Sequence, residues 1–191
     1  MRSFTPSLSL LALALSLAAC GGEAPAPKAP AAPPLAELER YFPLVDGKLF
    51  AYLSHGETGG TTLVVLRVER KSPGRGSLKG TSSTRDFTVT ANSIDRVGGG
   101  TVLKLPLKEG TAFVGDHGGR TSIVETELSV DVAAGHYAHC LRTEEEPTPI
   151  FSAKTRTTFC PDVGVVRLEV SSGERNETIE LQSYGDPVTI R

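Results

Sequence analysis

Residues 121–132 of this chain read Thr-Ser-Ile-Val-Glu-Thr-Glu-Leu-Ser-Val-Asp-Val. From Val124 to Val132 every second residue is apolar or threonine, and the residues between them are Glu, Ser and Asp. Side chains of a β-strand point alternately to the two faces of a sheet, so this period of two predicts a strand with one buried and one solvated face. It is the clearest structural signal in the sequence.

Shorter stretches of the same kind follow one another along most of the chain, separated by turns rich in glycine or proline. We expect further strands at residues 48–55, 61–71, 81–90, 92–97, 101–105, 136–144, 153–159, 163–170 and 177–184. About nine to eleven short strands predict an all-β fold with one strongly curved antiparallel sheet, a half-barrel or a barrel, and a sandwich is the alternative. Residues 35–40, after two prolines, predict at most one short N-terminal helix.

The first twenty residues differ in composition from the rest of the chain. A short basic start precedes residues 8–19, a run of Leu, Ala and Ser that is too short to span a bilayer and has the length of an export signal. The run ends in Leu17-Ala18-Ala19-Cys20, which two glycines follow. This motif resembles the lipobox of bacterial lipoprotein signals, in which the cysteine is acylated and the preceding residues are removed. The alternative is an ordinary signal peptide that is cut after Ala19.

The lipobox resemblance divides the chain into a signal peptide at residues 1–19, a lipidated Cys20 with a tether up to residue 34, and a single β domain at 35–191. Residues 21–34 contain five prolines and no aromatic residue, which predicts a disordered, extended tether. A lipidated cysteine implies stable attachment to a membrane of the bacterial cell envelope. Gly21 after the cysteine favours the outer membrane over the inner one by the sorting rule of enterobacterial lipoproteins.

The chain has three cysteines, an odd number for an exported protein. If the lipid takes Cys20, then Cys140 and Cys160 remain as an even pair in an oxidising compartment. We therefore predict a disulfide between Cys140 and Cys160. Two buried free thiols are the alternative.

One motif, Pro-Leu-x-acidic-Gly-x-x-Phe, occurs twice. Its shared positions are Pro43, Gly47 and Phe50 in the first copy and Pro106, Gly110 and Phe113 in the second. A proline, an acidic residue and a glycine that can adopt a positive φ are typical of a turn that leads an aromatic residue into the next strand. We interpret the motif as one such turn used twice, and a duplicated half-site is the alternative.

Three motifs resemble those of uncharacterised bacterial lipoproteins and periplasmic proteins with curved antiparallel sheets. They are Tyr-Phe-Pro-Leu-Val-Asp-Gly-Lys-Leu-Phe-Ala-Tyr at residues 41–52, Gly-His-Tyr-Ala-His-Cys at 135–140 and Cys-Pro-Asp-Val-Gly-Val-Val at 160–166. The third contains turn residues Pro161 and Gly164, and its Cys160 stands where alanine is common, as an acquired partner of Cys140. The chain is more loosely similar to the half-barrels of lipoprotein carriers, whose concave face holds acyl chains. This resemblance implies no catalytic residues.

Histidine and cysteine occur close together at His136, His139 and Cys140. Residues three apart on a strand point to opposite faces, so the two histidines cannot share an ion, and a disulfide would remove the thiolate that zinc needs. We expect no metal site.

The sequence shows no arrangement of residues for catalysis. Asp116-His117 lies among glycines, and without a nucleophile motif in the chain we interpret it as a solvated hairpin loop. The acidic run at residues 144–146 is interpreted as solvated too, and weak calcium binding is the alternative. We expect no catalytic residue and no cofactor, and a formal net charge of −2 argues against nucleic acid as a partner.

These observations predict a non-enzymatic, membrane-tethered module of the cell envelope. It would bind an apolar or lipid ligand in its concave face or a protein partner. One alternative is a structural lipoprotein that supports an envelope assembly. The other is an envelope hydrolase that uses His117 or His136 with a carboxylate brought near by folding.

Overall fold

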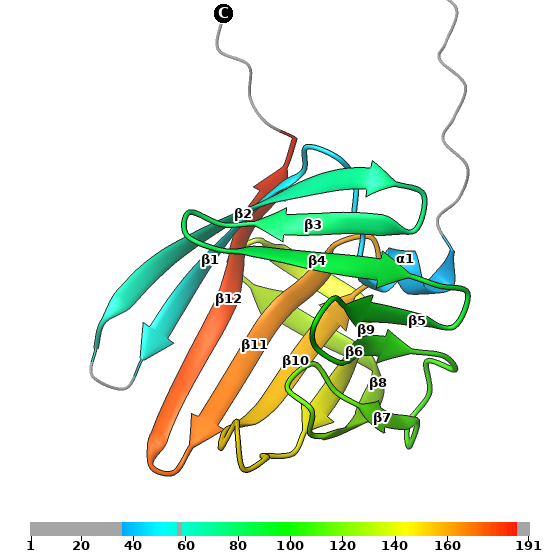
Figure 1. Cartoon of the computed structure of the whole chain (residues 1–191). Helices are drawn as coiled ribbons and strands as arrows, with labels where there is room; N and C mark the ends of the chain where they lie inside the picture. Colours follow the sequence, from blue (N-terminus) through cyan, green and yellow to red (C-terminus); the bar gives the residue numbers. More distant parts are fainter. Residues whose placement is uncertain (1–35, 57–58, 187–191) are drawn as a thin grey trace, which may run out of the picture. The chain divides into compact units, whose positions relative to one another are not determined.

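The computed structural model describes residues 36–56 and 59–186. The predicted signal peptide, Cys20 and the tether lie outside the described residues. The described part forms one short helix, α1 (Glu37–Tyr41), and a series of strands (Figure 1). These are β1 (Leu49–Gly56), β2 (Thr61–Ser72), β3 (Arg75–Lys79), β4 (Thr84–Val89), β5 (Ser93–Arg96), β6 (Thr101–Lys104), β7 (Ala112–Val114), β8 (Arg120–Val132), β9 (Gly135–Glu145), β10 (Lys154–Cys160), β11 (Gly164–Ser172) and β12 (Arg175–Gly185). No helix in this part of the chain is long and apolar enough to cross a membrane.

All twelve strands form one antiparallel sheet in the order β6-β5-β4-β3-β2-β1-β12-β11-β10-β9-β8-β7. Neighbours in the sheet are also neighbours in the chain, except that β1 pairs with β12. The edge strands β6 and β7 are consecutive in the chain and meet through one parallel bridge between Thr101 and Gly115. The sheet is therefore a nearly closed barrel with a weak seam between β6 and β7 (Figure 1). This confirms the all-β class and the curved antiparallel sheet.

Residues 36–56 and 59–186 form twelve strands, slightly more than the expected nine to eleven. The sequence does not predict β3 and β7. β3 begins within residues 72–76, where a proline and two glycines are typical of a turn. Gly76 is buried in β3, and a Cβ on it would lie 3.1 Å from Leu44, so the glycine makes room for that side chain. β7 is three residues long, which is too short for a recognisable period.

β8 contains the stretch that predicts the fold, but its two faces are not uniform. The pairing of β8 with β9 shifts register three times between Ile123 and Val130, and Glu127 has a φ of 57°. Each shift changes which face the following residues occupy. Ile123 is consequently buried and Val124 is 41% exposed, whereas Val130 is buried as the period of two predicts. The expectation of one continuous buried face is wrong for the first half of β8.

The glycine of the repeated turn motif has the same conformation in both copies. Gly47 and Gly110 have φ values of 79° and 82°. The Gly47 N–H donates to the carbonyl of Val68 on β2 over 3.0 Å, and the Gly110 N–H donates to the carbonyl of Ile123 on β8 over 2.9 Å. The phenylalanine that ends each motif is buried on the strand that follows, β1 or β7. Both turns thus attach the start of a strand to its neighbour in the sheet.

The helix α1 is fixed to the loop between β10 and β11. Arg40 makes two hydrogen bonds to the carboxylate of Asp162, over 3.0 and 2.8 Å, and its carbonyl accepts the Asp162 N–H over 2.6 Å. The hydroxyl of Tyr41 donates to the carbonyl of His139 on β9 over 2.8 Å. Tyr41 of the first resemblance motif thus contacts the second motif, and Arg40, the residue before the first motif, contacts the third.

A disulfide joins Cys140 on β9 to Cys160 at the end of β10, which confirms the predicted pairing. Both cysteines are fully buried. Gly164 follows with a φ of 99°, and a Cβ on it would lie 3.1 Å from the ring of Pro43. The chain before β1 therefore packs directly against the turn that follows the disulfide.

We predict that replacing Cys140 and Cys160 together by alanine lowers the free energy of unfolding by about 3 kcal/mol, because the disulfide restricts the unfolded chain. Urea denaturation measures this change, and reductant should lower the midpoint of the wild-type chain in the same way. The double variant is its own control, since reductant should leave its midpoint unchanged. Equal stability of wild type and variant would contradict the prediction.

Candidate functional site

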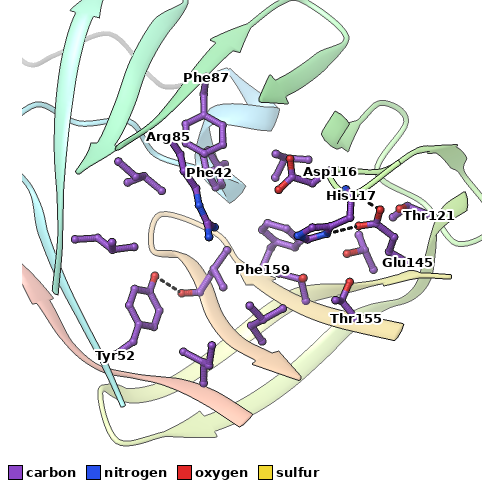
Figure 2. Close-up of a pocket in the computed structure, with 18 of the residues that line it drawn as sticks. Phe42, Tyr52, Arg85, Phe87, Asp116, His117, Thr121, Glu145, Thr155 and Phe159 are labelled. Atoms are coloured by element: carbon purple, nitrogen blue, oxygen red, sulfur yellow. Dashed lines mark hydrogen bonds and ion pairs between the residues drawn. The ribbon is translucent and has the colours of Figure 1, made fainter. Parts of the chain in front are cut away.

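The inner side chains leave a cavity of about 350 Å³ inside the barrel. This volume lies within the range of small-molecule sites. The larger part of its wall is apolar and is formed by Phe42, Tyr52, Val64, Leu66, Leu78, Phe87, Val102, Phe159, Val165, Leu168 and Ile179. Phe42 follows α1, and the other residues come from β1 and β12 and from strands on both sides of that pair (Figures 1 and 2).

Strand alternation explains the apolar wall. Val64 and Leu66 on β2 line the cavity, whereas Leu63 and Val65 point outward and are 62% and 42% exposed. On β1, Tyr52 points inward and its hydroxyl donates to the carbonyl of Val165 over 3.0 Å. Burial raises the pKa of the Tyr52 phenol, so the ring stays neutral and adds to the apolar wall.

The opposite end of the cavity is polar and is built across β8, β9 and β10. Thr121, Glu145 and Thr155 pair directly across these strands and share the inner face. Thr143 and Thr157 form the next row. The hydroxyl oxygen of Thr121 is buried and has no hydrogen-bond partner among the described residues. The sequence does not predict this polar end of the cavity. The only signal for it is the spacing of two between Thr143 and Glu145 and between Thr155 and Thr157.

Glu145 is the central residue of the polar end. Its Oε1 accepts hydrogen bonds from the backbone N–H groups of His117 and Gly119, over 2.8 and 3.0 Å. Its Oε2 lies 3.1 Å from Nδ1 of His117 (Figure 2). The packing is tight, because a Cβ on Gly115 would overlap Thr121. One buried carboxylate thus holds the loop between β7 and β8 against β9.

The loop between β7 and β8 is also attached across the seam. Arg96 on β5 forms an ion pair with the carboxylate of Asp116, and its Nη2 donates to the Asp116 carbonyl over 2.8 Å. The Gly100 N–H donates to the same carbonyl over 3.3 Å. Both carboxylates of the cavity wall, at residues 116 and 145, therefore have partners within the protein.

The interpretation of Asp116-His117 as a solvated loop is only half correct. The two residues do lie in the loop between β7 and β8, but their side chains are 21% and 33% exposed and line the cavity. The His117 ring stacks on Phe151 of the β9–β10 loop, with ring centroids 4.1 Å apart. The partner of His117 is Glu145. The sequence predicts a solvated Glu145 because it belongs to the acidic run at residues 144–146, but the residue is buried.

The other histidines lie away from the cavity. His136 is exposed and its Nδ1 lies 2.7 Å from Asp131, whereas His139 is exposed and its Nδ1 lies 2.5 Å from Glu127. No group of three His, Cys, Asp or Glu side chains within residues 36–56 and 59–186 could hold a metal ion. The structure therefore brings only His117 of the two candidate hydrolase histidines to the cavity.

The acidic run at residues 144–146 divides between three environments. Glu144 pairs with Lys154 and Arg156, over 2.5 and 2.8 Å. Burial raises the pKa of Glu144, but the hydrogen bonds from these two cations outweigh it and the net shift is downward. Glu145 points into the barrel, and Glu146 is exposed.

Comparisons with known proteins show the fold. No protein-family model matches the chain, and no curated protein is significantly similar to it. The structure is similar to a Bacteroides fragilis protein assigned as exported, with a YmcC-like fold, at a TM-score of 0.51 and 14% identity over 74% of this chain and 97% of that one. A protein of Parabacteroides distasonis assigned as a lipoprotein gives a TM-score of 0.48 at 10% identity over 76% and 98% of the two chains. The first similarity supports a shared fold, and the second is too weak to add to it.

We predict that Glu145→Ala lowers the free energy of unfolding by about 2–4 kcal/mol, because it leaves the N–H groups of His117 and Gly119 without an acceptor. Glu145→Gln should lower the free energy of unfolding by less, because the amide oxygen of glutamine can still accept a hydrogen bond from these N–H groups. Urea denaturation measures the stabilities, and hydrogen exchange at the Gly119 amide reports the loop directly.

The matched control is Glu146→Ala, which alters an exposed neighbour and should change stability by no more than about 0.5 kcal/mol. Equal effects at positions 145 and 146 would show that the buried carboxylate does not hold the loop.

Proposed function

We propose that this chain is a non-catalytic, lipid-anchored protein of the bacterial cell envelope that binds the apolar chain of a ligand inside its barrel. The observation that carries the proposal is the cavity of about 350 Å³ with its wall of aliphatic and aromatic side chains. Each methylene group of a ligand that moves from water into such a wall contributes about 0.8 kcal/mol. A short acyl chain would thus bind without any specific polar contact.

The sheet edges favour a ligand in the cavity over a protein partner that adds a strand. Strand addition needs a free edge with a row of unpaired backbone groups. Here the edge strands β6 and β7 are four and three residues long and meet each other at the seam. A partner strand would have little edge to pair with.

The lipid anchor is supported by the motif at Leu17–Cys20 and by the proline-rich segment after it. The fold similarity to a protein assigned as exported agrees with secretion. The proposed location is the outer membrane, on the basis of Gly21 after the cysteine. Residues 20–34 would act as the tether between the bilayer and the barrel.

Cys20→Ala should move the protein from the membrane fraction to the soluble envelope fraction, because acyl chains are then no longer attached. Cell fractionation and metabolic labelling with radioactive palmitate measure this. Cys140→Ala is the control, since it should leave the label in place. Label on the Cys20→Ala chain would contradict lipidation at this cysteine.

Val64→Phe should weaken the binding of a fluorescent fatty-acid analogue at least tenfold, because the larger ring occupies the cavity. The measurement is a fluorescence titration of the chain from residue 20 onward with Cys20→Ala, which requires no competing detergent. Val65→Phe is the matched control, because Val65 lies on the outer face of the same strand. Its affinity should equal that of the parent chain.

Two results would overturn the ligand proposal. One is the absence of any fluorescence change with the parent chain. The other is equal binding by the Val64→Phe and Val65→Phe variants, which would place the probe outside the barrel.

A further inference from the structure

Four side chains of the cavity wall carry or can carry a charge: Arg85, Asp116, His117 and Glu145. Asp116 is paired with Arg96. Glu145 is bound by two backbone N–H groups and by the ring of His117. The negative charges of the wall are thus already balanced by groups of the protein.

The positive charge of Arg85 has no such balance. Among the described residues no carboxylate lies within ion-pair distance of its guanidinium group, and no hydrogen bond holds it. The other basic side chain of the wall, His117, is held by Glu145. Arg85 is therefore the unpaired charge of the cavity in the described chain.

The fold places Arg85 on the face of β4 that lines the cavity, although the residue as a whole is exposed. Its cross-strand partner on β3 is Leu78, and Phe87 follows two residues later on β4, so both share its face of the sheet and both line the cavity. Asp86 between them points outward, where its carboxylate meets Lys71 over 2.7 Å. In Figure 2 the Arg85 side chain points into the cavity.

We infer that the ligand is a single-chain amphiphile with an anionic oxygen head group, a carboxylate or a phosphate monoester, bound by Arg85. The guanidinium fork matches two oxygens of either group, and hydrogen bonds between charged groups are roughly twice as strong as neutral ones. The tail would lie along the apolar wall beside Tyr52. This inference rests on the proposed function and names the class of ligand.

A cationic head group does not fit this arrangement. It would face the guanidinium of Arg85, and the carboxylates that could attract it are occupied by Arg96 and by the Glu145 network. A neutral head group would leave the positive charge of the exposed Arg85 with solvent alone. The site therefore discriminates between head groups by charge.

The test compares four ligands with the same twelve-carbon tail: dodecanoate, dodecyl phosphate, dodecanol and dodecylamine. Calorimetric titration below the micellar concentration gives each dissociation constant for the chain from residue 20 onward with Cys20→Ala. In that parent chain both anions should bind more tightly than the alcohol, and the amine should bind most weakly. The two anions separate a carboxylate from a phosphate ligand.

Arg85→Gln should raise the dissociation constants of dodecanoate and dodecyl phosphate about tenfold, which is about 1.4 kcal/mol, and leave that of dodecanol unchanged. The matched control is Arg67→Gln on β2. Arg67 is exposed like Arg85, but it follows the inward-facing Leu66 on β2 and does not line the cavity, so its removal should alter none of the four constants. Added salt should weaken binding of the anions to the parent chain and not that of the alcohol.

The outcomes separate this inference from the proposed function. If dodecanol binds and Arg85→Gln leaves the anions unaffected, or if the amine binds most tightly, the anionic head group is wrong while the apolar cavity stands. If the parent chain binds none of the four ligands, the proposed function itself fails. If Arg85→Gln and Arg67→Gln weaken the binding of the two anions equally, the effect comes from the net charge of the protein. That result would also overturn the head-group site.

Discussion

The pairing of β1 with β12 is the constraint on which the rest of the structure depends. It runs from Leu49 opposite Gly185 to Gly56 opposite Glu177, and it joins the first strand in the chain to the last. Without it, β1–β6 and β7–β12 would be two separate meanders, each with one apolar face exposed. With it, Tyr52 on β1 and Ile179 on β12 become parts of one cavity wall. The binding site is therefore a product of sheet closure and belongs to no single hairpin.

The other side of the barrel closes by different means. Between β6 and β7 there are one backbone bridge and one hydrogen bond from the Gly100 N–H to the Asp116 carbonyl, and side chains supply the other links. Arg96 reaches from β5 to the loop after β7, and Glu145 holds that loop from β9. Buried carboxylates that are fully hydrogen-bonded stabilise such a junction, whereas an unpaired one would destabilise it. The main role of the polar end of the cavity is thus to hold the barrel together at the seam. Its carboxylates are therefore not free to bind a ligand.

Much of the fold follows from the sequence, because alternation of apolar and polar residues appears wherever a strand has one buried face. It does not follow at β3, where Gly76 serves close packing against Leu44, nor in the first half of β8, where register shifts exchange the two faces. The predicted disulfide is present because β9 and β10 are adjacent. The polar end of the cavity was out of reach, because Glu145 and His117 meet only through the register of β8 against β9. The sequence also did not predict a role for Arg85, because a single arginine in a strand sequence does not indicate whether its side chain faces solvent or a cavity.

The repeated turn has a further consequence, for the order in which the barrel forms. The turns around Gly47 and Gly110 stand before β1 and β7, the first strands of two successive sets of six. Within each set every pairing is a hairpin between consecutive strands, so the loop-closure entropy of each step is small. Only the β1–β12 pairing and the seam require segments that are distant in the chain or on opposite edges of the sheet. In this architecture the closure of the ring is the single step that has to wait for both halves.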